Sequence, residues 1–187
     1  YPADERTVFE EEGILMTVDS RQSCSENPFS YSYGIAKTDG TERHFSFNSL
    51  VSILAFNVTD PDISKIIISG NNKEFLAGRV RASYEEAYVE SVINGSEQIE
   101  IIAEDVMATG RHYAAVLPQN FNSGITISMI HKEGTYSVVH IKAFECMGRG
   151  IVDLTNLEES RTSETIITTA NELKKFLESA ASLPSDH

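Results

Sequence analysis

The chain has 187 residues, of which 41% are hydrophobic and 23% charged, as in an ordinary globular protein. This composition excludes wholesale disorder, a collagen helix and a coiled coil. With 28 acidic and 15 basic residues the formal net charge is −13, so phosphate backbones and anionic membrane surfaces would repel the chain. Nucleic acid is therefore not expected as a partner.

Short runs rich in β-branched and aromatic residues, separated by turn residues, dominate the chain up to residue 157. The fully apolar run at 66–68 is typical of a central strand in a two-layer protein. Asn94-Gly95 and Glu133-Gly134 stand between such runs and predict tight hairpins. The spacing favours an all-β fold, an antiparallel β-sandwich. The expected strands cover residues 13–18, 33–37, 44–47, 50–58, 63–69, 78–83, 88–93, 98–102, 112–117, 125–130, 135–143 and 151–154.

The C-terminal segment changes character. Residues 158–165 are polar and predict a linker, and Thr169 and Glu172 have the spacing of a capping box at a helix start. One helical face then carries an apolar stripe, formed by Ala170, Leu173, Phe176, Leu177 and Ala180. We expect one sandwich over residues 1–157, and a linker and short α-helix over 158–187 that lead into a further module. Residues 1–44 either complete the sandwich or form a smaller N-terminal sheet.

The chain begins at Tyr1 rather than Met, so we expect either a processed product or a deliberately shortened chain, and a removed export signal is compatible with this start. No apolar run approaches the roughly 20 residues that cross a bilayer. Cys24 and Cys146 belong to no CxxC pair. They are either two unrelated thiols or one long-range disulfide, which would need an oxidising compartment.

The histidines give no metal signal, because none has the spacing of a zinc site. Counting from the turn at Glu133-Gly134 places His131 opposite Tyr136 and His140 opposite Ile127, too far out of register for a shared ligand set. Both are expected to face solvent or to make one hydrogen bond.

Acidic and aromatic side chains do not point to a site either. Asp60 and Asp62, and likewise Glu85-Glu86, are expected to be solvated loop residues, and Gly148-Arg149-Gly150 is too short for a phosphate loop. Sheet or core packing is favoured over sugar stacking for the tyrosines at 31, 33, 84 and 88. No catalytic, cofactor-binding or metal-binding residue is predicted, and we expect no enzyme activity.

Five segments form a pattern in their order and spacing: residues 45–58 (FSFNSLVSILAFNV), 63–72 (ISKIIISGNN), 76–80 (LAGRV), 113–118 (YAAVLP) and 125–129 (ITISM). With Tyr1-Pro2 and residues 36–40, this pattern resembles the fimbrillin-like adhesins of Bacteroidetes cell surfaces, over about residues 1–157. The physical role of these motifs is structural. Residues 69–72 would turn the chain after a buried strand, and Gly78 would allow a close backbone approach.

The resemblance implies a fimbrillin/transthyretin-like β-sandwich displayed on an exported outer-membrane lipoprotein, whose anchoring cysteine would lie upstream of Tyr1. It implies cell adhesion or display through a host or microbial surface ligand, protein or glycan, without catalysis and without a cofactor.

Residues 166–177 resemble the helical lead-in to repeat-rich β-helix regions of large surface proteins. This favours the N-terminal domain of a non-polymerising protein, monomeric as a fragment. Two alternatives remain: an accessory or carbohydrate-binding domain of a larger polysaccharide-active β-helix enzyme, and a pilus subunit.

Overall fold

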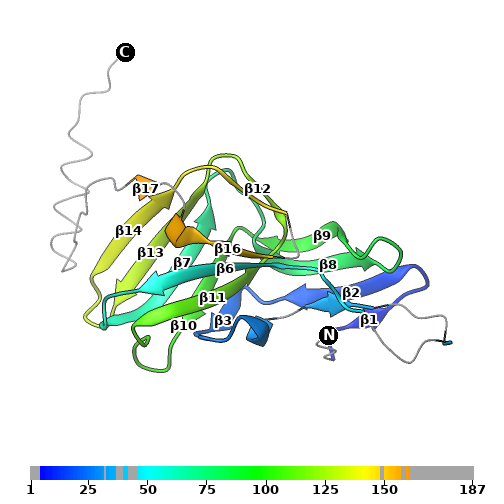
Figure 1. The fold of residues 1–187 in the computed structure, drawn as a ribbon, viewed down its shortest axis with the longest axis horizontal. Coiled ribbons are helices and arrows are strands. Elements are labelled where there is room, and N and C mark those ends of the chain that lie inside the picture. The colour runs from blue at the N-terminus through cyan, green and yellow to red at the C-terminus, as the bar shows by residue number, and fades with distance from the viewer. Residues whose placement is uncertain are drawn as a thin grey trace, which may run out of the picture.

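The computed structural model describes residues 5–31, 33–36, 40–41, 46–147, 150–156 and 159–160 (Figure 1). This part of the chain is all-β, with two short 3-10 turns, and none of its helices has the length and apolarity needed to cross a membrane. The elements are β1 (Val8–Phe9), β2 (Gly13–Val18), β3 (Arg21–Ser23), η1 (Pro28–Tyr31), β4 (Gly34–Ile35), β5 (Asn48–Ser49), β6 (Ser52–Val58), β7 (Ile63–Gly70), β8 (Ala77–Ser83), β9 (Val89–Ser96), β10 (Gln98–Ile102), β11 (Gly110–Val116), β12 (Gln119–Phe121), β13 (Ile125–His131), β14 (Tyr136–Ile141), β15 (Phe144–Cys146), β16 (Ile151–Asp153), η2 (Leu154–Asn156) and β17 (Glu159–Ser160).

Two sheets form the larger end of the molecule in a sandwich-like arrangement. The six-stranded sheet has the order β17-β14-β13-β7-β10-β3, and the three-stranded sheet has the order β11-β6-β16 (Figure 1). Within the six-stranded sheet β7 has a central place, as predicted. Ile66 and Ile68 are fully buried, but Ile67 is only partly buried.

A four-stranded sheet, β1-β2-β8-β9, extends from the other end (Figure 1). The N-terminal part of the chain is shared among sheets, because β2 pairs with β8 whereas β3 pairs with β10. The latter pair and the pair of β16 with β6 are parallel, so the fold is not purely antiparallel. Of the linker and helix expected over residues 158–187, the structure describes only residues 159–160, which form β17. The domain boundaries stay a prediction.

The turn predicted at Asn94-Gly95 is wrong. Both residues lie inside β9, with Gly95 opposite Gly78 of β8, and the chain changes sheet only at Glu97. The glycines serve close packing instead: a Cβ on Gly95 would overlap the ring of Phe75, and one on Gly78 would overlap the carbonyl oxygen of Asn94. The close approach expected at Gly78 is thus confirmed. An aromatic ring over a strand glycine is a known way to stabilise such a position.

The hairpin predicted at Glu133-Gly134 is confirmed, with a different register. Gly134 has a φ of 84°, and the peptide N–H of His131 donates to the carbonyl of Thr135. This is the geometry of a three-residue loop that ends in a left-handed glycine. His140 consequently lies opposite Thr126. The prediction that paired it with Ile127 was wrong by one residue.

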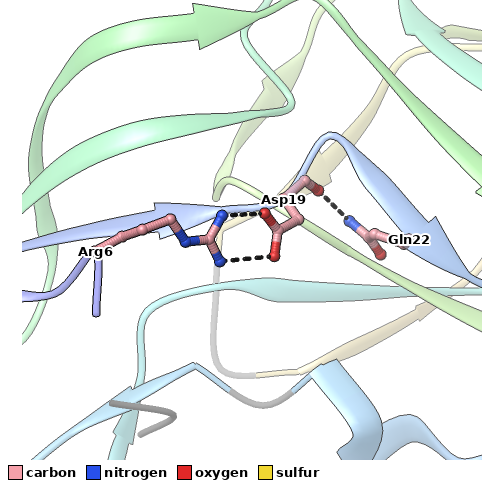
Figure 2. Close-up of polar contacts among 3 residues, drawn as sticks. All are labelled: Arg6, Asp19 and Gln22. Carbon is pink, nitrogen blue, oxygen red and sulfur yellow. Dashed lines mark hydrogen bonds and ion pairs between the residues drawn. The ribbon is translucent and has the colours of Figure 1, made fainter. Parts of the chain in front are cut away.

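The outer edge of β11 is sealed by the side chain of Gln22 from β3. Its amide Nε2 donates to the carbonyl of Ala115 at 2.8 Å, and its Oε1 accepts the N–H of Ala115 at 2.9 Å. The same Nε2 also donates to the carbonyl of Asp19, whose carboxylate binds both terminal nitrogens of Arg6 (Figure 2). The Arg6–Asp19 pair is exposed and adds little stability. The buried amide instead ties β3 of one sheet to β11 of the other.

Candidate functional site

Cys24 and His112 form a hydrogen-bonded pair that the sequence did not predict. Cys24 follows β3, His112 lies on β11, and Sγ is 3.1 Å from Nδ1. The other ring nitrogen, Nε2, is 2.7 Å from the carbonyl oxygen of Ala108. A carbonyl oxygen can only accept a hydrogen bond, so Nε2 carries a hydrogen. In the neutral ring Nδ1 therefore accepts a hydrogen bond from the thiol. The backbone thereby fixes both the tautomer and the orientation of the base.

A hollow of about 730 Å³ opens beside this pair. His112 is only 1% exposed, whereas Cys24 is partly exposed. The imidazole therefore lies beneath the thiol, out of solvent. The other lining residues come from β3 and the loop that follows it, and from the end of β10 and the loop that follows that strand; they are Arg21, Gln22, Ser23, Glu26, Ile102, Ala103, Glu104, Val106, Met107 and Ala108.

The surroundings of Cys24 favour the neutral thiol. Partial burial raises the pKa of Cys24 above its ordinary value, and the negative charge of Glu26 raises it further. Cys24 by itself is therefore not a preformed thiolate of the kind found in many catalytic cysteines.

Replacing Glu26 by glutamine is expected to lower the pKa of Cys24, because it removes a negative charge that disfavours the thiolate. The substitution should remove only part of the rise in the pKa of Cys24, because burial is the larger cause of that rise. The measurement is the ultraviolet absorbance of the thiolate against pH in a Cys146→Ala background. Glu104→Gln is the matched control, because Glu104 lines the same hollow but does not contribute to the shift. An equal shift in both variants would contradict this assignment.

Cys146 is a separate, buried thiol. It lies on β15, and both cysteines are free in the structure. Burial raises the pKa of Cys146, while the hydroxyl of Ser52 opposes this effect. The structure therefore agrees with the hypothesis of two unrelated thiols and not with that of a disulfide.

The structure does not bring the two strand histidines together. Nδ1 of His140 is 2.9 Å from Oγ1 of Thr126, the residue opposite on β13. Nδ1 of His131 is 3.5 Å from a carboxylate oxygen of Asp60, whose other oxygen accepts the N–H of Asp62. Each has a local polar partner, as expected for strand histidines. In the described part of the chain, no three His, Cys, Asp or Glu side chains group closely enough to hold a metal ion.

The tyrosines considered for sugar stacking differ in exposure, and the side chain of Tyr31 lies outside the described part of the chain. Tyr33 is buried in the core, Tyr84 packs partly against it, and Tyr88 is exposed. Glu85 lies in the turn after β8, with its N–H donated to the hydroxyl of Ser83. Gly148 and Arg149 fall outside the described residues.

Comparisons with known proteins give a loose likeness. No family model matches the chain, and no curated protein matches it. Among solved structures, the chain is similar to one described as a "putative cell adhesion protein from Bacteroides uniformis", with 16% sequence identity and a TM-score of 0.49. The match covers 90% of this chain and 70% of the other. A likeness at this level says nothing of what this chain binds.

Proposed function

We propose that this chain is a non-catalytic, surface-exposed domain of an exported bacterial protein, which acts in cell adhesion or display. Its partner would be a protein or glycan on a host or microbial surface. A lipid anchor upstream of the chain would hold it at the outer membrane. The net charge of −13 fits this role, because self-repulsion keeps a displayed domain soluble.

The observation that supports this proposal is the place of the resembling segments in the fold. Residues 63–72 form the central strand β7 and its turn, in which the amide of Asn71 donates to the carbonyl of Ser123. Residues 76–80 enter β8 through Gly78, with a φ of 132°. Residues 113–118 contribute to β11. The motifs shared with the adhesin pattern therefore hold the framework of the sheets and leave the rest of the surface free to differ.

The four-stranded sheet offers the contact surface in this proposal. Its outer strands expose large apolar side chains, among them Phe9 on β1, which is 72% exposed, and Ile93 on β9, which is 55% exposed. Exposed apolar side chains of this kind can form the buried core of an interface, where a few residues carry most of the binding energy.

The experiment couples the full 187-residue chain to beads and measures their retention on host matrix proteins, glycan arrays and bacterial cells. Retention above that of blank beads is expected on at least one of these surfaces. Ile93→Thr should weaken retention about tenfold, the effect of losing roughly 1.4 kcal/mol.

Ile151→Thr is the matched control, because Ile151 on β16 is 50% exposed but belongs to the three-stranded sheet. It should retain full binding. Failure on every surface would reject adhesion, and equal losses in the two variants would reject the four-stranded sheet as the contact surface.

A further inference from the structure

The Cys24–His112 pair has the arrangement of a nucleophile beside a positioned base. A thiol within hydrogen-bond reach of an imidazole, whose far nitrogen is held by a third group, is the geometry that activates cysteine for attack. Here the thiol is 3.1 Å from Nδ1, and the carbonyl of Ala108 is 2.7 Å from Nε2. Because His112 is buried, its ring has no competing contact with bulk water.

Access to the thiol comes from the hollow. Its volume of about 730 Å³ is large enough for a small organic molecule, and Cys24 is the partly exposed member of the pair. The charged and titratable groups around it are Arg21 from β3, Glu26 and Glu104 from the loops, and His112 from β11. Cys146, by contrast, is buried on β15, so a small reagent would reach Cys24 first.

We propose that Cys24 is a site of thiol–disulfide exchange with small, uncharged disulfides that enter this hollow, with His112 as the base. In this step Nδ1 of His112 takes the thiol proton while Sγ of Cys24 bonds to one sulfur of the disulfide. The disulfide S–S bond breaks, and the departing thiolate takes the proton from His112. The products are a mixed disulfide at Cys24 and one small thiol, so the disulfide itself is the oxidant.

Transfer of the proton to His112 avoids the energetic cost of forming an unpaired thiolate at Cys24. Burial and Glu26 disfavour a net negative charge at Cys24. When the proton moves only as far as Nδ1, the Cys24–His112 pair keeps a net charge of zero. The exchange therefore proceeds at neutral pH without free thiolate, and its rate depends little on pH between about 7 and 9, around the ordinary thiol pKa.

The test treats the folded 187-residue chain with bis(2-hydroxyethyl) disulfide and follows the adduct by intact mass, with peptide mapping to locate it. One adduct is expected, at Cys24. It should be absent in Cys24→Ser and form at an unchanged rate in Cys146→Ala. Modification of Cys146 before Cys24 would overturn the proposal.

The role of the base is tested by the pH profile of His112→Gln, after circular dichroism has shown that the variant folds. Its rate at pH 7 should fall at least about tenfold and should rise with pH, because it then depends on free thiolate. A profile parallel to that of the unmodified chain would overturn the role of His112. If His112→Gln does not fold, the flat profile of the unmodified chain carries the test, and a rate that rises tenfold per pH unit rejects the base.

Discussion

Alanine at position 124 is expected to lower the free energy of unfolding by at least about 3 kcal/mol, because it combines backbone strain with a steric overlap. Gly124 has a φ of 73°, and a Cβ built there would overlap the carbonyl oxygen of Ile141. The overlapping group is backbone, held by the pairing of Ile125 with Ile141. The glycine cannot shift away either, because Ile125 also pairs with Gly70 on the other side.

Gly134→Ala is the matched control for this prediction. Gly134 has a φ of 84°, similar to that of Gly124, but a Cβ there would meet no atom within 4 Å. Alanine at 134 should therefore cost only the left-handed backbone penalty, about 1 kcal/mol. Urea unfolding followed by circular dichroism measures both losses. Equal losses would show that the overlap with Ile141 relaxes freely and that the clash argument is wrong.

The contrast between these glycines also shows what the sequence could predict. The turn at Glu133-Gly134 was found because a hairpin loop is a local feature, written in adjacent residues. The same type of signal failed at Asn94-Gly95, since the glycine there accommodates the ring of Phe75 and faces Gly78. A dipeptide pattern carries no information about such neighbours from other strands.

The candidate site was missed for a related reason. Cys24 and His112 are 88 residues apart, and neither has a neighbour in the chain that marks it as part of a pair. They meet because β3 joins the six-stranded sheet in parallel to β10, beside the edge of β11. A strand of three residues is too short to show an alternation of apolar and polar residues, so the sequence did not predict β3 or its parallel pairing. The central strand β7, by contrast, was predictable because residues 66–68 are three consecutive isoleucines, which have a high β-propensity.

Gln22→Leu is expected to lower the free energy of unfolding by about 3 kcal/mol or more, since buried polar groups left without partners cost about 1–3 kcal/mol each. The change keeps the size of the side chain but removes the bonds to both the N–H and the carbonyl of Ala115. These groups face the outer edge of β11, and no strand of the described residues pairs with that edge. The carbonyl of Asp19 loses the same donor (Figure 2).

Two further variants separate this explanation from simple loss of packing. Gln119→Leu should cost less than about 1 kcal/mol, because Gln119 makes one exposed bond, to the carbonyl of Phe75. Gln22→Glu places a carboxylate beside two carbonyl oxygens, so the folded state raises its pKa above the unfolded value of about 4.3. Its stability should be highest below that pH and fall as pH rises through the folded pKa. Urea unfolding between pH 4 and 8 measures this slope relative to the unmodified chain, and a matching slope would mean that the amide of Gln22 does not seal the edge of β11.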